Sequence, residues 1–232
     1  AHCNLGNTYH ELDQLDAAIN SYSKAVAIRK NYAEAYYNLG ITLHQLGQLD
    51  TAAKSYAQAL AVKPDYAEAH SNLGVIFKEL DQFNLAIQHQ KHALEINPEF
   101  AEAHYNLGVA LKDSGQHHEA LRSYERALSI DPDYTDARWN LSLIQLLTEH
   151  FKEGWANYEW RWLSKGHDPE RHYPHSKWEG QPLKGKTLLI YTEQGIGDEV
   201  MFCSCLPDLI SQAPKLIILE CDHRLKPLLE RS

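Results

Sequence analysis

The chain has 232 residues, 44% of them hydrophobic, and a formal net charge of −9. This length accommodates one elongated domain or two small ones, with enough apolar residues for a packed core. Residues 1–150 hold most of the charge, with 11 basic and 19 acidic side chains, so they repel phosphates. Nucleic acid and anionic membranes are therefore excluded as expected partners, and a neutral or basic peptide fits better.

An Asn-Leu-Gly motif recurs at a fixed interval of 34 residues. It stands at 4–6, 38–40, 72–74 and 106–108, and it weakens to Asn-Leu-Ser at 140–142. This period is typical of helix-turn-helix repeats, each of which buries a face against its neighbours. A stack of such repeats forms an extended scaffold with a continuous groove. A binding surface is therefore our first hypothesis for function, and a catalytic pocket is the second.

Within each repeat we number the Leu of the motif as position 7. Small residues at positions 8 and 20 predict a close approach of two helices, and large residues at 7, 11 and 24 fill the space between them. Proline at position 32 ends the second helix of three repeats (Pro64, Pro98, Pro132). The pattern resembles the tetratricopeptide repeat, which has Leu-Gly, aromatic, Ala and Pro residues at these offsets.

The resemblance implies a mainly α fold, a right-handed α-solenoid with four repeats over residues 1–134. Residues 135–163 keep the helical pattern but lose Gly at position 8 and Ala at positions 20 and 27. We expect this segment to be a degenerate fifth repeat that caps the stack, since terminal repeats are usually atypical.

Position 6 is asparagine in all five units: Asn4, Asn38, Asn72, Asn106 and Asn140. At about 100° per residue, position 6 points away from the packing face, together with positions 2, 9 and 13. Neighbouring helices lie roughly 8–10 Å apart, so one amide would meet an extended peptide at about every third residue. Asparagine both donates and accepts, so it can hold peptide backbone. The alternative is that these amides bond to neighbouring helices and only stiffen the stack.

Tyr37 and Tyr105, at position 5, are further groove candidates. Their rings either stack on ligand side chains or pack against the next repeat. Some tetratricopeptide domains clamp a C-terminal carboxylate with Lys at position 5 and Asn at position 9. Position 5 has no Lys here (Cys3, Tyr37, Ser71, Tyr105, Trp139), so such a clamp is not expected.

All five tryptophans fall between residues 139 and 178. An apolar stripe at helical spacing predicts a hydrophobic cap that docks the solenoid onto the next part of the chain, with an aromatic sugar platform as the alternative (Phe151, Trp155, Tyr158, Trp162). Residues 164–186 are rich in Pro and Gly and indicate a linker. We expect its histidines to be solvated rather than metal ligands (His167, His172, His175).

The last segment, 187–232, has a different pattern. An apolar strand at 187–191 leads into a Gly-rich turn at 193–198 and a helix at 199–212 with Pro207 inside it. A second strand at 215–220 and a short helix at 224–230 follow. This β-α-β order predicts the incomplete start of a Rossmann-like α/β domain. The turn lacks the third glycine of the dinucleotide fingerprint, so no cofactor is expected in this chain.

The stretch from Trp178-Glu179-Gly180 to Gly197-Asp198-Glu199 resembles the junction in bacterial tetratricopeptide-repeat glycosyltransferases. These have a heptosyltransferase-like two-Rossmann (GT-B) domain, and the architecture also resembles O-GlcNAc transferase, whose repeats carry a similar Asn row. The resemblance implies that Asp198 is a general base, with Gly195, Gly197 and Glu199 in the acceptor loop. The alternative is that Asp198 caps a helix and Glu199 complements its dipole; the two roles are compatible.

We therefore predict a scaffold that holds extended polypeptide and, in a longer parent protein, presents acceptors to an attached glycosyltransferase domain. The alternative is a pure interaction scaffold with no transferase activity. The donor-binding half of a GT-B enzyme is absent from the sequence, so we expect this chain alone to be inactive, and a nucleotide sugar would act only in the parent. The solenoid ends are candidates for self-association.

The four cysteines show neither metal-ligand nor disulfide-framework spacing (Cys3, Cys203, Cys205, Cys221). Reduced thiols indicate a cytoplasmic protein. The sequence shows no charged-then-apolar leader and no apolar run of membrane-spanning length, so neither a signal peptide nor a span is expected. The chain starts inside a repeat without Met, which we interpret as a piece of a longer protein.

Overall fold

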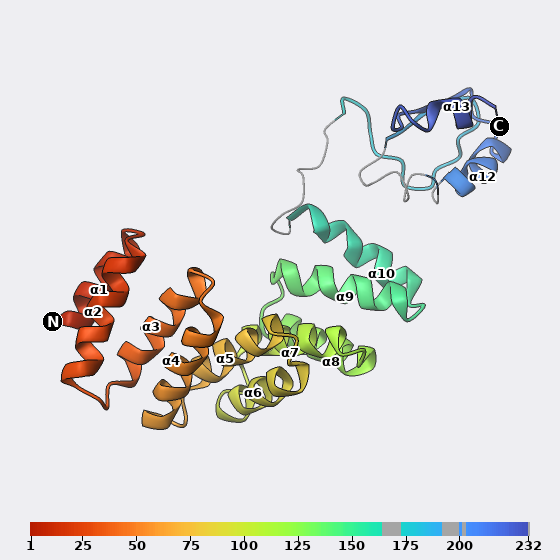
Figure 1. The fold of residues 1–232 in the computed structure, drawn as a ribbon. Helices are drawn as coiled ribbons and strands as arrows, with labels where there is room; N and C mark the ends of the chain where they lie inside the picture. The colour runs from red at the N-terminus through yellow and green to blue at the C-terminus, as the bar shows by residue number, and fades with distance from the viewer. Residues whose placement is uncertain (164–172, 192–199, 201–202, 232) are drawn as a thin grey trace. The chain divides into compact units, whose positions relative to one another are not determined.

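The computed structural model describes residues 1–163, 173–191, 200 and 203–231. These residues form two compact units, one up to residue 163 and one from residue 173. The first unit holds the repeats, and the second holds a small parallel sheet (Figure 1). In the described ranges, every helix is too short or too polar to cross a membrane.

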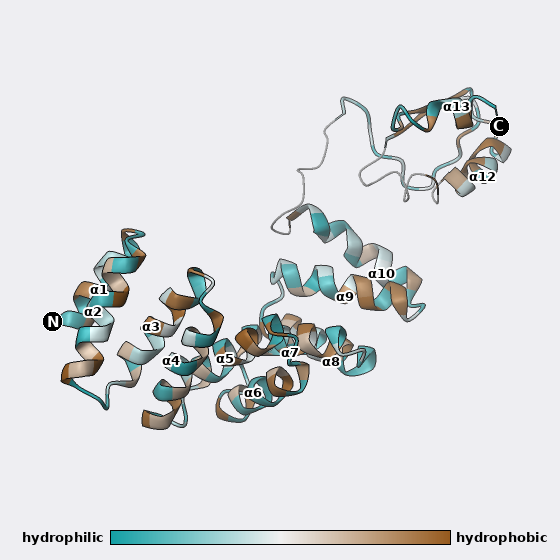
Figure 2. Cartoon of the chain, viewed as in Figure 1, coloured by the Kyte–Doolittle hydropathy of each residue, from teal (hydrophilic) through white to brown (hydrophobic). Residues whose placement is uncertain are grey.

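Helices α1 to α10 of the first unit form five consecutive pairs, one pair per repeat (Figure 1). Figure 2 shows that hydrophobic and hydrophilic residues both occur around each helix, as expected for helices that pack on one side. The helix bounds are α1 His2–Glu11, α2 Leu15–Ile28, α3 Ala33–Gln45, α4 Leu49–Val62, α5 Ala67–Glu79, α6 Phe83–Ile96, α7 Ala101–Asp113, α8 His117–Ile130, α9 Thr135–Leu147 and α10 Phe151–Tyr158.

The odd-numbered helices lie on the inner side of the stack. Helices α2, α4, α6 and α8 each pack between the odd helix of their own repeat and the odd helix of the next. The odd helices also contact one another directly across repeats, from α1 to α3 and so on to α9. The even helices of the described residues do not contact one another to the same extent, so the stack curves toward the odd helices. We call the surface formed by the odd helices at positions 2, 6, 9 and 13 the inner face.

A glycine-on-tyrosine contact brings the two helices of a repeat together. A Cβ atom on Gly40 would lie 2.6 Å from the ring of Tyr56, and one on Gly108 would lie 2.6 Å from Tyr124. Both rings are at most 1% exposed. The predicted close approach at position 8 is therefore confirmed. In the third repeat Gln90 replaces the tyrosine, and its Nε2 donates to the Ser71 carbonyl at 2.8 Å.

In the third, fourth and fifth repeats, the side chain at position 4 bonds to a carbonyl group just beyond the end of the preceding even helix. His70 Nε2 lies 3.1 Å from the carbonyl oxygen of Pro64, and His104 Nε2 lies 3.0 Å from that of Pro98. In the fifth repeat Arg138 donates to the Pro132 carbonyl at 2.6 Å. Helices α4, α6 and α8 each end two residues before these prolines. The proline positions thus end helices as predicted, and their carbonyl groups are used to join repeats.

The turn inside each repeat uses a left-handed residue at position 15. The φ angles there are all positive, between 56° and 81°, at Asp13, Gly47, Asp81, Gly115 and Glu149. Glycine adopts this conformation freely, whereas a residue with a Cβ is strained there by about 1–2 kcal/mol. The five turns therefore share one geometry although only two of the five residues are glycine.

The fifth repeat keeps its first helix and shortens its second. Helix α10 ends at Tyr158, and a 3-10 helix, Glu159–Leu163, follows. Arg161 stands where the other repeats have a buried alanine; it is 7% exposed, and its guanidinium carbon lies 4.5 Å from the ring centre of Tyr158. Arginine is too large for the close helix contact that alanine permits, so the helix does not continue.

The predicted aromatic stripe is interrupted by this early end. Trp162 lies in the 3-10 helix, so it does not continue the α-helical stripe of Phe151, Trp155 and Tyr158. Phe151 and Trp155 remain 55% and 49% exposed within the described residues. The prediction of a single four-residue stripe on one helix is therefore wrong at its last member.

The second unit pairs strand β1, Thr187–Ile190, in parallel with strand β2, Leu216–Leu219. Leu188 lies opposite Ile217 in this register. Short helices α12, Leu206–Ser211, and α13, Lys226–Leu229, accompany the strands. Two short parallel strands agree with a β-α-β start, but the described residues do not establish a Rossmann-like domain.

The helix predicted over 199–212 is corrected in its described part. Residues Cys203–Cys205 form a 3-10 helix, and α12 begins only at Leu206. Pro207 consequently lies in the first turn of α12, where it removes no helical hydrogen bond. A proline inside a longer helix would have removed one, which explains why a separate helix begins at Leu206.

The Gly40–Tyr56 contact predicts a large effect of a single methyl group. Gly40→Ala should destabilise the protein by about 1–3 kcal/mol, because the buried ring has no room to move. In a Tyr56→Ala background the same change should stabilise, since Ala favours a helix over Gly by about 1 kcal/mol. Urea unfolding of the four proteins measures both effects. Equal losses in the two backgrounds would show that the ring is not the obstacle.

His70 and His89 form a direct pair between α5 and α6, with Nδ1 atoms 3.1 Å apart. Because the Pro64 carbonyl only accepts, His70 Nε2 carries the proton, and its Nδ1 accepts from His89. Burial, with the charges of His70 and His92, lowers the pKa of His89 from 6.5 to about 4. Burial lowers the pKa of His70 as well, against the bond to the Pro64 carbonyl, which raises it; the charge of His92 lowers this pKa further and that of Glu95 raises it.

Stability should therefore fall as pH drops from 6.5 toward 4, because the unfolded chain binds protons that the folded pair excludes. His89→Gln keeps an N–H donor for His70 and removes one titrating group. The loss across this window should shrink by about 1 kcal/mol, less than full linkage because His89 is only half-buried. Urea unfolding at both pH values measures it, with the exposed His118→Gln as control. An unchanged pH slope in His89→Gln would contradict the assignment.

Candidate functional site

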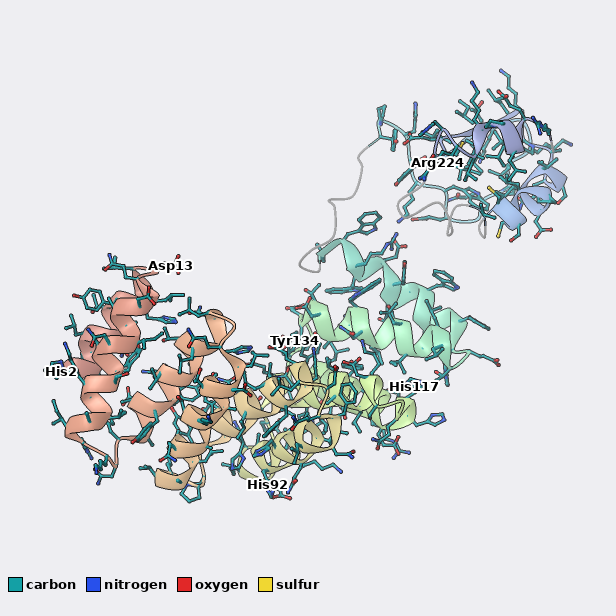
Figure 3. All side chains as sticks on the ribbon, in the orientation of Figure 1. His2, Asp13, His92, His117, Tyr134 and Arg224 are labelled. Atoms are coloured by element: carbon teal, nitrogen blue, oxygen red, sulfur yellow. The ribbon has the colours of Figure 1, made fainter. Side chains whose placement is uncertain are left out.

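The asparagines of position 6 lie on the odd helices of all five repeats. Asn4 is exposed, and the other four are half-buried (Asn38, Asn72, Asn106, Asn140). Three of them donate to the odd helix of the preceding repeat, so their side chains lie on the inner face. Figure 3 shows the side chains on the ribbon and labels Tyr134, which lies between α8 and α9.

These bonds form a series of rungs between repeats. Asn38 Nδ2 donates to Asn7 Oδ1 at 3.0 Å. Asn72 Nδ2 donates to the Tyr37 hydroxyl at 3.2 Å, and Asn106 Nδ2 donates to Ser71 Oγ at 3.3 Å. One N–H of each amide therefore joins neighbouring repeats. We refer to Asn38, Asn72 and Asn106 as the rung amides.

Each rung amide also has polar atoms that are not used in the bond to the preceding repeat. Their Oδ1 atoms accept no hydrogen bond from the described residues, and these oxygens are not buried. Each Nδ2 also carries a second N–H. Anchoring to the stack and contact with a ligand are thus compatible for the same side chain.

The row changes at the fifth repeat. Asn140 Nδ2 donates to the Asp136 carbonyl within α9 at 2.9 Å, and its Oδ1 accepts from Lys112 Nζ at 3.3 Å. Its side chain therefore makes no rung with Tyr105, which occupies the place that Tyr37 holds two repeats earlier. The Tyr105 hydroxyl has no hydrogen-bond partner among the described residues.

The rings of Tyr37 and Tyr105 pack against the protein itself. The Tyr37 ring centre lies 4.8 Å from that of Tyr66, and the Tyr105 ring centre lies 5.0 Å from that of Tyr134. Burial raises the pKa of both phenols, so they are neutral donors at ordinary pH. Packing thus accounts for the rings, while a ligand contact of either hydroxyl stays a prediction.

The expected catalytic loop lies outside the described residues, which leaves the predictions for Asp198, Gly195, Gly197 and Glu199 untested. The same holds for His167 and His172, while His175 is exposed. Across the part of the chain that the structure describes, no three His, Cys, Asp or Glu side chains come together as a metal site.

Sequence reasoning missed the partners of the rung amides. Position 5 of one repeat meets position 6 of the next, 35 residues later, in both the Tyr37–Asn72 and the Ser71–Asn106 bonds. His44 meets Glu79 at the same separation, with Nε2 3.1 Å from both carboxylate oxygens. A search for polar pairs one residue beyond the repeat length would have found these three pairs, but not the Asn38–Asn7 pair, whose residues are 31 apart.

Comparison with known proteins agrees with this arrangement. A TPR repeat model matches residues 6–47, 42–81 and 76–115, and a tetratricopeptide repeat model matches 101–134. Protein FlbA of Caulobacter vibrioides is 45% identical over 83 residues, which is 34% of this chain and 14% of that protein. The chain thus matches only about one seventh of the length of this relative.

Two examples illustrate the fold that this chain shares with solved structures. The crystal structure of MamA superimposes with a TM-score of 0.63 at 26% identity, over 67% of this chain and 91% of that one. YrrB, described as a TPR protein with an unusual peptide-binding site, gives a TM-score of 0.59 at 24% identity, over 68% and 82%. With repeat models covering residues 6–134 and this shared architecture, the chain belongs to the tetratricopeptide repeat family.

Proposed function

We propose that the repeats form a protein-interaction scaffold that binds an extended polypeptide along the inner face. The observation that carries this proposal is the state of the rung amides: each is fixed by one bond to the preceding repeat and still offers its Oδ1 atom. A peptide backbone presents N–H and C=O groups at regular intervals, and a fixed row of amides can match both.

Fixing the amides beforehand favours binding. A free asparagine loses side-chain freedom when it meets a ligand, whereas a rung amide has lost most of it already. The row still gives little affinity by itself. Net hydrogen bonds of about 0.5–1.5 kcal/mol each compare with an association cost of roughly 4–15 kcal/mol. Further contacts come from the half-buried aliphatic side chains at position 9 (Ile41, Val75, Val109, Leu143).

The fold shared with YrrB supports a peptide ligand only as a precedent for this architecture. The presentation of acceptors to an attached glycosyltransferase domain remains a proposal for the longer parent protein. It is supported by the resemblance around Asp198 and by the parallel pairing of β1 with β2. A scaffold without transferase activity fits the inner face of the repeats equally well.

The proposal predicts weak binding of an uncharged, unstructured peptide of about a dozen residues, long enough to span the three rungs. The dissociation constant should lie between about 10 μM and 1 mM. Replacing the rung amides together (Asn38→Ala/Asn72→Ala/Asn106→Ala) should weaken binding at least about tenfold, for the loss of roughly 1.4 kcal/mol or more. Fluorescence anisotropy of a labelled peptide measures both constants.

A matched variant separates ligand contact from stiffening of the stack. Tyr37→Phe/Ser71→Ala removes the partners of two rung amides and leaves the amides in place. It should bind the peptide more weakly than the original protein, because two amides are no longer fixed beforehand, but more tightly than the triple alanine variant, since the ligand-facing groups remain. Equal binding by all three proteins, or no binding by the original, would overturn the proposed function.

A further inference from the structure

Carboxylates stand on both sides of the asparagine row. Position 2, in the first turn of the odd helices, and position 13, at their ends, carry an acidic residue in most repeats. The first row is Glu34, Glu68, Glu102 and Asp136, and the second is Glu11, Glu79 and Asp113. Apart from the half-buried Asp136, all of these residues are exposed.

Helix stability explains only one of these rows. A carboxylate in the first turn complements the helix dipole, so position 2 stabilises the helix that carries it. A carboxylate at the last residue opposes the dipole, and position 13 is the last residue of α1, α5 and α7. Glu79 accepts a hydrogen bond from His44, and Asp113 lies 3.6 Å from Lys112, whereas Glu11 has no ion pair among the described residues. A cationic ligand would form favourable electrostatic interactions with the carboxylates of the second row.

The carboxylates of both rows affect the pKa of tyrosines that lie between them. Burial, and then the charges of Glu68 and Glu102, raise the pKa of Tyr37, which bonds to a rung amide. Burial also raises the pKa of Tyr22 to about 12, with Glu11 of the second row and Glu34 of the first among the contributing charges. The negative potential of successive repeats therefore overlaps along the asparagine row.

Basic side chains on the same surface are too few to cancel this potential. Lys78 and Lys112 stand at position 12, next to the second row. Lys112 is already engaged, with Asp113 at 3.6 Å and Asn140 at 3.3 Å. Seven carboxylates thus face two lysines at positions 2, 12 and 13 of the odd helices.

We propose that the ligand of the inner face is a cationic extended peptide with Lys or Arg at about every third residue. This inference rests on the proposed function and specifies its ligand. Repeats about 10 Å apart correspond to about three residues of an extended chain. Residues three apart in such a chain point to opposite sides. Successive basic side chains would therefore meet the first and second carboxylate rows in turn, while the backbone meets the amides.

Three peptides of one length test the charge preference, with Lys, Gln or Glu at every third residue and otherwise identical uncharged sequence. The Lys peptide should bind at least about tenfold tighter than the Gln peptide, and the Glu peptide should bind more weakly than either. The advantage of the Lys peptide should shrink as salt is raised, because exposed charges are screened. Anisotropy titrations of the unaltered protein give all of these values.

Two triple variants then locate the charges. Glu34→Gln/Glu68→Gln/Glu102→Gln neutralises first-turn carboxylates of the inner helices α3, α5 and α7. Asp16→Asn/Asp50→Asn/Glu119→Gln neutralises first-turn carboxylates of the even helices α2, α4 and α8. Both change the net charge and the helix ends equally. The first triple should lose most of the preference for Lys, and the second should keep it.

The outcomes separate this inference from the proposed function. If the Gln peptide binds through the rung amides and the Lys peptide binds no tighter, the charge inference fails and the proposed function stands. If none of the peptides binds, both fail. Equal loss of preference in the two triples would show that only net charge matters, which also overturns the inference. Circular dichroism confirms that both triples fold, and the salt series on the unaltered protein tests the inference independently of them.

Discussion

The close contact between glycine at position 8 and the buried side chain at position 24 governs the geometry of the solenoid. With no Cβ in the way, the two helices of a repeat approach until the ring of Tyr56 or Tyr124 lies directly on glycine. The approach lets each even helix fit between two odd helices, and the odd helices then touch across repeats. The same contact therefore fixes both the packing of one unit and the curvature that gathers the position-6 side chains on one face.

The asparagine row serves the stack and remains open to a ligand. In the middle repeats, one N–H of each amide bonds to the preceding odd helix, and the carbonyl oxygen remains without a protein partner in the described residues. A side chain used in this way is held in position before any ligand arrives. At the fifth repeat Lys112 takes the oxygen of Asn140, so the open row ends where the repeat pattern itself degenerates.

Much of the first unit follows from the sequence, because each of its helices is specified by local signals. The 34-residue period, glycine at position 8 and proline at position 32 predict the pairs and their ends. The left-handed turn was not predicted, because its sequence signal is a glycine. Gly47 provides that signal in the second repeat, whereas Asp13 and Glu149 adopt the same conformation without it. The early end of α10 also escaped prediction, because the packing of Arg161 against Tyr158 depends on the surrounding fold.

The position-6 row was predicted from periodicity, whereas its partners were not. Helical angles show which side chains share a face, but they do not give the offset between neighbouring helices. That offset decides that Asn72 meets Tyr37 rather than Asn38. The α/β fold of the last segment was harder still to predict from the sequence, because the parallel pairing of β1 and β2 depends on residues far apart in the chain.

The central claim is that the rung amides hold the stack and touch the ligand at once. Side-chain amide signals of Asn38, Asn72 and Asn106, followed by NMR during a peptide titration, test it directly. The account predicts that these three signals move in step with peptide occupancy, while that of Asn140, whose groups are already used, moves least. Saturation with peptide while the three signals stay in place would contradict it.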